Sequence, residues 1–150
     1  MKIESAQKDD HIILSDITYK AKAFWGYEKA QLEKWQEDLT ISPEYITAND
    51  TYKLRLQEKI IGYYSVIKVE KETLKLDNIF VLPEYIGKGY GKILMRDCIS
   101  KAKSEGFKKI ILDAEPKAEG FYKKIGFETI NQLQSSIAER FLPQMKLSII

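Results

Sequence analysis

The sequence predicts an α+β (mixed α/β) fold, in which a mixed central β-sheet carries helices on both faces. Two observations lead to this class. Strand-like and helix-like patterns follow one another in the order β, α, α, three antiparallel strands, α, β, α, β, β. One of these strands, residues 76–82, leads through a glycine-rich turn directly into a helix. A chain of 150 residues can bury one sizeable core, so we assign residues 1–150 to a single domain.

The N-terminal half is predicted to contain one strand, three helices and a hairpin. The expected elements are a strand at 2–7, helices at 9–24, 28–39 and 43–48, and paired strands at 51–57 and 60–69. Asp9 or Asp10 is expected to cap the first helix, and Ser42 before Pro43 indicates the start of the third. Gly62 inside the second hairpin strand is expected to mark a bulge.

Three aromatic side chains surround a glycine at the junction of the first two helices. They are Phe24, Trp25 and Tyr27, and the glycine is Gly26. Such rings either fill the core between two helices or line a pocket for a partly polar ligand, and the sequence leaves both interpretations open. Trp25 and Tyr27 are therefore candidate residues of a substrate pocket.

The C-terminal half is predicted to form a β-α-β unit followed by a helix and two strands. The expected elements are a strand at 73–82, a helix from about Gly89 to Gly106, a strand at 109–114, a helix at 117–125, and strands at 127–130 and 145–150. A strand that follows strand and helix should lie parallel to the first. Pro143 before the last strand fits an edge or entry position.

Composition excludes several classes of function. The 31% of charged and 44% of hydrophobic residues are typical of a globular protein, and a net charge of +2 favours neither nucleic acid nor a membrane surface as partner. One histidine, His11, and one cysteine, Cys98, provide no His/Cys metal cluster, and Cys98 is expected in the core. Without a signal-type N-terminus or a long apolar run, we expect a cytoplasmic protein.

The glycine-rich turn is the strongest functional signal. Pro83 ends the strand, and Gly87, Gly89 and Gly91 precede or open the helix. Amide groups at a helix start lack intrahelical partners and the helix dipole is positive there, so glycines at this place form a cradle for an anion such as phosphate. Neither G-x-x-x-x-G-K-[ST] nor G-x-G-x-x-G fits the residues.

The turn resembles the pyrophosphate loop of the GNAT N-acetyltransferase superfamily, [QR]-x-x-G-x-[GA]. Gly89-Tyr90-Gly91 matches its glycines, whereas Ile86 occupies the place of Gln or Arg. A second segment, Phe121 to Phe127 (FYKKIGF), resembles the superfamily's F-Y-x-x-x-G-F motif. A subgroup of small bacterial acetyltransferases shares further segments, which are here W-G-Y at 25–27, A-x-P-x-A at 114–118 and S-S-I-x-x-R-x-L-P at 135–143. Glu115 stands where many members have asparagine, and its expected role is charge at a helix start.

The resemblance implies an acetyl-CoA-dependent N-acetyltransferase that needs no metal and forms no covalent enzyme intermediate. The pantetheine arm would lie where the parallel strands part, and the Val81 amide would hold the thioester oxygen. Tyr122 is the candidate general acid for the CoA sulfur, and Asp77 the candidate base, with Glu115 and a water relay as alternatives. The residues implied in cofactor binding are Phe80, Val81, Ile86, Gly87, Lys88, Gly89, Tyr90, Gly91, Lys92 and Phe121.

Two other functions remain open on the same fold. One is a non-catalytic acyl-CoA-binding module that regulates a partner, and the other is a protein-interaction module that uses the aromatic residues at 24–27. We expect a small-molecule amine as acceptor, because Trp25, Tyr27, Trp35 and Phe141 suggest a small, partly apolar pocket. Exposed edge strands near the C-terminus also allow a homodimer.

Overall fold

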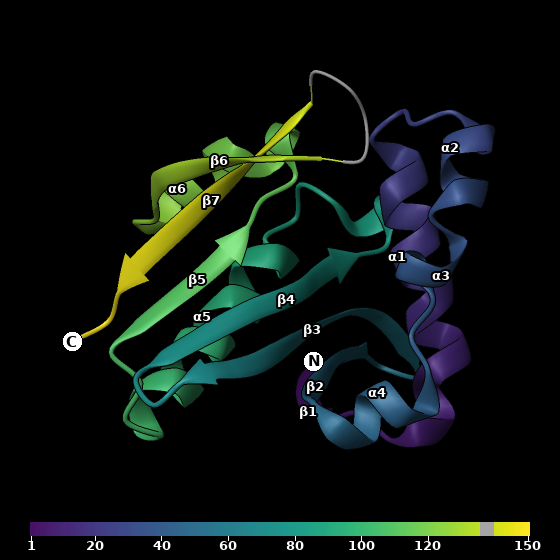
Figure 1. Cartoon of the computed structure of the whole chain (residues 1–150). Coiled ribbons are helices and arrows are strands. Elements are labelled where there is room, and N and C mark those ends of the chain that lie inside the picture. The colour runs from purple at the N-terminus through teal and green to yellow at the C-terminus, as the bar shows by residue number, and fades with distance from the viewer. Residues whose placement is uncertain (136–139) are drawn as a thin grey trace. The chain divides into compact units, whose positions relative to one another are not determined.

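The computed structural model describes residues 1–135 and 140–150, and within them it forms one mixed sheet of seven strands, ordered β1-β2-β3-β4-β5-β7-β6 (Figure 1). In chain order the elements are β1 (Lys2–Ser5), 3-10 helix η1 (Lys8–Asp10), α1 (His11–Phe24), α2 (Lys29–Lys34), α3 (Gln36–Leu39), α4 (Pro43–Ala48), β2 (Asp50–Leu56), β3 (Lys59–Glu70), β4 (Thr73–Val81), η2 (Pro83–Tyr85), α5 (Tyr90–Ser104), β5 (Lys109–Asp113), η3 (Pro116–Ala118), α6 (Glu119–Ile125), β6 (Glu128–Gln134) and β7 (Phe141–Ser148). The predicted α+β class with a mixed sheet is confirmed.

The described chain forms two compact units. Unit 1 comprises Met1–Val66 and Asn78–Cys98, and unit 2 comprises Ile67–Asp77 and Ile99–Ile150. Strands β3 and β4 and helix α5 each contribute residues to both units. The assignment of residues 1–150 to one domain stays a prediction.

Unit 1 is built on the antiparallel strands β1, β2 and β3. Leu54 of β2 pairs with Gly62 of β3, but the next residue, Arg55, pairs with Ile60, so Ile61 is an extra residue on β3. The bulge predicted at Gly62 is therefore confirmed. There is also a steric reason for glycine at position 62, because a Cβ atom there would lie 2.8 Å from the backbone oxygen of Phe80. The glycine allows the end of β4 to approach β3 closely.

Replacing Gly62 should destabilise unit 1 more than its small size suggests. We expect Gly62→Ala to lower the free energy of unfolding by about 1–3 kcal/mol, because a backbone oxygen cannot move aside as a flexible side chain can. The midpoint of urea unfolding measures this loss. The control is Gly120→Ala in α6, where an added Cβ meets no atom within 4 Å and alanine favours the helix. Equal effects of the two substitutions would contradict the steric explanation.

The helices of unit 1 confirm two predictions and correct a third. α1 buries Leu14, Ile17 and Ala21, and Ser42 caps α4 by accepting a hydrogen bond from the amide of Tyr45 at 3.0 Å. The single helix predicted at 28–39 is wrong, because α2 and α3 are separated at Trp35, whose backbone (φ −90°, ψ 5°) is not helical. At this break the Trp35 ring lies edge-on to the Tyr27 ring, a tertiary contact of the kind that can override a helical pattern. In Figure 1, α1 runs alongside α2 and α3.

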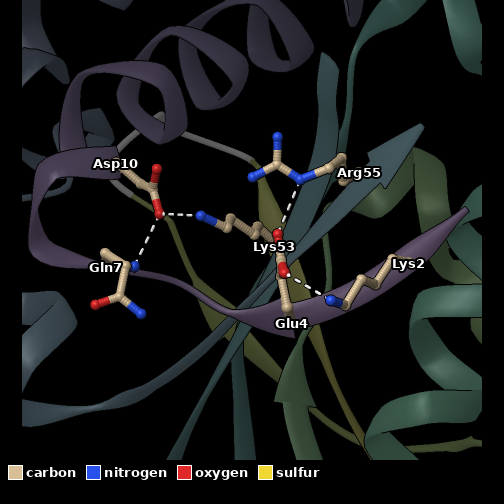
Figure 2. A network of polar contacts seen from close by, with 6 residues as sticks. All are labelled: Lys2, Glu4, Gln7, Asp10, Lys53 and Arg55. Carbon is tan, nitrogen blue, oxygen red and sulfur yellow. Dashed lines mark hydrogen bonds and ion pairs between the residues drawn. The ribbon is translucent and has the colours of Figure 1, made fainter. Parts of the chain in front are cut away.

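A network of charged side chains fastens η1 and β1 to β2 (Figure 2). Asp10 Oδ2 accepts hydrogen bonds from Lys53 Nζ at 2.7 Å and from the amide of Gln7 at 2.8 Å. Beside this pair, Glu4 contacts Arg55 Nε at 2.9 Å and Lys2 Nζ at 3.5 Å. Asp10 does precede α1, as predicted, but its carboxylate does not cap that helix. It faces Gln7 and Lys53 because Lys53 would otherwise be a buried charge without compensation.

Loss of the buried Lys53–Asp10 ion pair should reduce the free energy of unfolding far more than loss of the exposed Lys2–Glu4 pair. Lys53 and Asp10 side chains are 8% and 14% exposed, so Lys53→Met leaves a largely buried carboxylate without its cation, with the Gln7 amide as a remaining hydrogen-bond donor. We expect the free energy of unfolding to fall by about 3 kcal/mol, which lowers the melting temperature by roughly 6–12 °C. Lys2→Ala is the control, since the Lys2 side chain is 72% exposed, and it should leave the melting temperature nearly unchanged. Similar losses in both variants would contradict this ranking.

Unit 2 contains the strand pairings β4–β5, β5–β7 and β7–β6, and Figure 1 shows the last three strands in that order. β4 and β5 are parallel over Thr73–Lys75 and Lys109–Ile111, as the β-α-β pattern predicts. The last strand starts at Phe141 rather than at Met145, and it lies between β5 and β6. The C-terminal edge strand is therefore β6.

The edge or entry position predicted for Pro143 is therefore wrong, because Pro143 is buried and lies inside an interior strand. The physical reason is local. Its carbonyl oxygen accepts a hydrogen bond from the amide of Ala114 at 2.8 Å, one residue beyond the end of β5. In a strand, the backbone nitrogen and the carbonyl oxygen of one residue point to the same side. The nitrogen of Pro143, which has no hydrogen to donate, therefore points toward the chain beyond the end of β5, where no strand partner needs it.

Glycines end both long C-terminal helices as predicted. Gly106 follows α5 with φ +88°, and Gly126 follows α6 with φ +122°. The apolar face of α5 is buried at Leu94, Met95 and Cys98, which confirms Cys98 as a core residue. Among the described residues, no helix is both long enough and apolar enough to cross a membrane.

Candidate active site

The glycine-rich turn follows β4 within unit 1. The amide of Leu82, directly after the strand, donates to Ile61 of β3 at 2.8 Å. Pro83 then starts η2, and the amide of Ile86 donates back to the Pro83 carbonyl at 3.2 Å. Ile86 therefore uses its amide within the turn, while its side chain is 41% exposed. The amide groups that can face a ligand begin after it.

Two glycines in the turn have backbones that other residues rarely adopt. Gly87 and Gly89 have φ values of +82° and +88°, and the intervening Lys88 has a negative φ. This alternation is the pattern in which successive N–H groups converge into an anion-binding concavity. A Cβ atom built on either glycine would meet no atom within 4 Å. The space above both glycines is therefore open, as a cradle for a ligand requires.

The start of α5 adds further donors. The first i to i−4 hydrogen bond of the helix runs from Ile93 N to Gly89 O at 3.1 Å, so the amides of Tyr90, Gly91 and Lys92 in the first turn lie before the point where this bonding begins. The 15 residues of α5 provide a full dipole whose positive end lies at these amides. Lys88 and Lys92 are exposed and add positive charge. The turn, as predicted, combines oriented amides with cations.

Two residues of this surface were not predicted from the sequence. The ring of Tyr85 in η2 stands edge-on to Tyr90 at 5.9 Å between centroids. The ammonium groups of Lys88 and Lys59 lie 5.7 Å and 5.5 Å from the centroid of the same Tyr85 ring. Lys59 begins β3, 26 positions before Tyr85, and only the folded hairpin brings it to the turn. No local sequence signal could have identified it.

The end of β4 lies beside a second polar group in unit 1. Asn78 Nδ2 donates to Ser65 Oγ at 3.0 Å and to Tyr45 Oη at 3.3 Å. Phe80, two residues further and on the same face of the strand, has its ring 6.0 Å from that of Tyr63. Phe80 and Val81 are half-buried. Asn78 was also missed by sequence analysis, because its partners come from α4 and β3.

Asp77, the candidate base, lies on β4 and is exposed. Its neighbours in sequence, Leu76 and Asn78, are buried and half-buried, so the alternation of the strand turns Asp77 to the other side. An exposed carboxylate keeps contact with water, through which a proton can also leave.

The aromatic residues after α1 form a cluster with one ammonium group. Trp25 and Tyr27 are half-buried, and Tyr27 stands edge-on to Trp35 at 5.0 Å. Lys22 Nζ lies 6.0 Å from the centroid of Tyr27 and 5.8 Å from that of Trp35. These distances allow a cation–π interaction with both rings. The cluster therefore has the chemistry to contact an alkylammonium group, whichever of its two predicted roles it performs.

The candidate acid, Tyr122, lies in unit 2. Its side chain projects from α6 and is 8% exposed, with the rings of Phe121 and Phe127 at 5.2 Å and 5.8 Å. Burial, and after it the negative charge of Glu115, raises the pKa of the Tyr122 phenol well above its usual value. The phenol therefore keeps its proton throughout the neutral range.

Glu115 stands at the start of the short helix η3, as predicted, but its side chain makes no capping hydrogen bond there. Its Oε2 instead lies 2.7 Å from Nη2 of Arg140. Both residues belong to the segments shared with small bacterial acetyltransferases. Residues 136–139 of the second segment lie outside the described part of the chain.

A family model gives the identity of the fold. The model of the acetyltransferase (GNAT) domain matches residues 13–148. The chain belongs to the GNAT family.

Relatives and solved structures agree with the family. An uncharacterized N-acetyltransferase, ycf52, of Gracilaria tenuistipitata var. liui is 27% identical over 104 residues, which cover 69% of this chain and 56% of the relative. The chain thus spans little more than half the length of that relative.

Among solved structures, a GCN5-related N-acetyltransferase from Rhodopseudomonas palustris has a TM-score of 0.82 at 19% identity and covers 98% of this chain and 94% of its own. The PaiA N-acetyltransferase of Thermoplasma acidophilum, in complex with coenzyme A, has a TM-score of 0.79 at 20% identity and covers 99% of both chains. At such identities the likeness concerns the fold.

Proposed function

We propose that this GNAT domain is an acetyl-CoA-dependent N-acetyltransferase that transfers the acetyl group directly to the amine of a small acceptor. The observation that carries the proposal is the turn before α5. Gly87 and Gly89 combine positive φ with open space, and the first amides of the helix follow immediately. This arrangement suits an anion with several oxygens, and the coenzyme A bound to the Thermoplasma acidophilum relative has such a group in its pyrophosphate.

The donor would be bound mainly through backbone groups. The amides from Gly87 to Lys92 would hold the pyrophosphate, and Lys88 and Lys92 would compensate its charge. Binding through amides explains why Ile86 can replace the usual Gln or Arg, since its exposed side chain is not needed for the cradle. Phe80 and Phe121 would contact the apolar parts of the donor.

Acetyl transfer would follow by direct attack of the amine nitrogen on the thioester carbonyl. The C–N bond forms, the carbonyl oxygen becomes an oxyanion that the Val81 amide stabilises, and the C–S bond then breaks. Tyr122 Oη would give its proton to the leaving CoA sulfur. The raised pKa of Tyr122 makes it a weaker donor, but desolvation raises the pKa of a buried thiolate as well, so the transfer stays feasible.

The acceptor must arrive as an ammonium ion and lose a proton before it can attack, because a lysine-type amine titrates near pH 10.4. Asp77, which is exposed, would accept this proton directly or through water. Trp25 and Tyr27 would contact the acceptor, since the rings of Tyr27 and Trp35 already lie near the ammonium group of Lys22. We place this reaction in the cytoplasm, where the buried thiol of Cys98 would stay reduced.

The proposal is tested by measuring thiol release from acetyl-CoA with a panel of amines. The panel contains polyamines, amino acids, aminoglycosides and peptides, and product mass confirms N-acetylation. We expect turnover with at least one small amine. Binding of CoA without transfer to any amine would instead support a regulatory acyl-CoA-binding module. If Trp25→Ala left amine kinetics unchanged but altered the oligomeric state, the aromatic cluster would serve protein interaction.

A further inference from the structure

Two ammonium groups lie near one aromatic ring beside the glycine-rich turn. The Nζ atoms of Lys59 and Lys88 are 5.5 Å and 5.7 Å from the centroid of the Tyr85 ring. The ring of Tyr90, the first residue of α5, stands edge-on to the same ring at 5.9 Å. All four residues belong to unit 1. We refer to Lys59, Tyr85 and Lys88 as the lysine–tyrosine group.

The lysine–tyrosine group adjoins the amide cradle of the turn but is not part of it. The Ile86 amide is used within the turn, so the amides that can face a ligand begin after Tyr85 and Ile86. Lys88 lies between the two glycines of positive φ and connects the group to the cradle. Lys59 is exposed and comes from the start of β3. The group therefore adds positive charge next to the place proposed for the pyrophosphate.

The Tyr85 ring keeps both ammonium groups near one place before any ligand is present. A cation is attracted to the face of an aromatic ring, and this attraction limits the rotamers of a long, flexible lysine side chain. A ligand then binds with a smaller loss of conformational entropy. In the part of the chain that the structure describes, neither lysine forms an ion pair, although Glu58 and Glu84 are close in sequence. Both positive charges can therefore act on an anion from outside the chain.

The proposed donor has a second anionic group that matches these two charges. Besides its pyrophosphate, coenzyme A carries a phosphomonoester at the 3′ position of the ribose, and such a group has close to two negative charges near neutral pH. We propose that the lysine–tyrosine group binds this phosphomonoester, and that Lys59 distinguishes acetyl-CoA from 3′-dephospho-acetyl-CoA. The inference rests on the proposed function, because it assumes that the cradle holds the pyrophosphate of the same donor. Lys92 would stay with the pyrophosphate, and Lys88 would lie between the two anionic groups.

The test compares the dissociation constants of acetyl-CoA and 3′-dephospho-acetyl-CoA, measured by calorimetric titration at one low salt concentration and without an amine. We expect the unaltered protein to bind acetyl-CoA about 10-fold or more tightly, because hydrogen bonds between an ammonium group and a phosphate are charge-assisted. Lys59→Gln should reduce this preference to about threefold by weakening acetyl-CoA alone, with the affinity for the dephospho donor nearly unchanged. Lys59→Arg keeps the charge and should keep most of the preference.

Two further comparisons separate the ring and the net charge from the lysine itself. Tyr85→Phe keeps the ring and should keep the preference, whereas Tyr85→Leu removes the ring and should reduce the preference by about twofold or more. The control for net charge is Lys68→Gln, near the other end of β3, where the lysine side chain is 61% exposed. This control should leave both dissociation constants unchanged.

Two results would overturn the inference. One is equal affinity of the unaltered protein for the two donors. The other is an equal loss of both affinities in Lys59→Gln, because Lys59 would then act on a part that both donors share.

Failure of the proposed function gives a different result, since the titrations contain no amine. If the protein showed the preference and its loss in Lys59→Gln but acetylated no amine, the inference would stand and the proposed function would fail. Acetyl transfer without the preference would have the opposite meaning. Absence of binding for both donors would overturn both.

Discussion

Gly89→Glu should raise the dissociation constant for acetyl-CoA by about 100-fold or more, which corresponds to ~2.7 kcal/mol. The new side chain would enter the open space above the glycine, where no atom lies within 4 Å, and would put a carboxylate where the pyrophosphate is proposed to bind. Two like charges about 4 Å apart near a protein surface repel by roughly 4 kcal/mol, so the expected loss is within reach of the charge alone. Isothermal titration calorimetry measures the affinity.

Gly106→Glu is a closely matched control. Gly106 has the same φ of +88° and the same open surroundings as Gly89, but it follows the C-terminal end of α5. Both substitutions force a non-glycine residue into the left-handed region, at a cost of roughly 1–2 kcal/mol in folding. Only Gly89→Glu should weaken donor binding. Unchanged affinity in Gly89→Glu, or equal losses in the two variants, would show that the donor's phosphates lie elsewhere. Gly89→Ala separates steric hindrance from charge.

Tyr122→Phe should lower kcat by about 10-fold or more and leave the affinity for acetyl-CoA nearly unchanged. Phenylalanine can keep the ring contacts with Phe121 and Phe127, so the variant removes the donor hydroxyl alone. Steady-state kinetics give kcat, and a separate titration gives the affinity for the donor.

Tyr64→Phe is the control for the loss of a buried phenol hydroxyl. Tyr64 is 1% exposed and donates to Asp97 Oδ2 at 2.6 Å. Its removal should reduce the free energy of unfolding without reducing kcat. If Tyr122→Phe had the kcat of the unaltered protein, the acid would have to be another group or water.

The elements that were predicted correctly depend on residues close in sequence. Ser42 and Pro43 start α4, Gly106 ends α5, and Gly62 lies at the bulge, because caps and backbone torsions are decided by one or two neighbours. The glycine turn belongs to the same class. Its φ values and open space follow from glycine itself, so this backbone geometry could be predicted from a single stretch, whereas anion binding there stays a prediction.

The features that were missed depend on residues far apart in sequence. The break at Trp35 accompanies a ring contact with Tyr27, and Lys59 reaches Tyr85 only through the hairpin. Glu115 stands at the start of η3 as predicted, yet its ion-pair partner Arg140, 25 positions later, could not be inferred from its neighbours. Tertiary contacts of this kind override local preference, and no pattern along the chain encodes them.

A cradle made of main-chain amides has an evolutionary consequence. Every residue except proline supplies the same N–H, so mutation of Lys88 or Tyr90 leaves the amide donors of the turn in place, whereas the positive φ values of Gly87 and Gly89 favour glycine at those two positions. The proposed binding site for the acetyl donor can therefore persist while side chains around it diverge. Homologues of this chain should vary far more in the amino-acid sequence of the turn than in its backbone conformation.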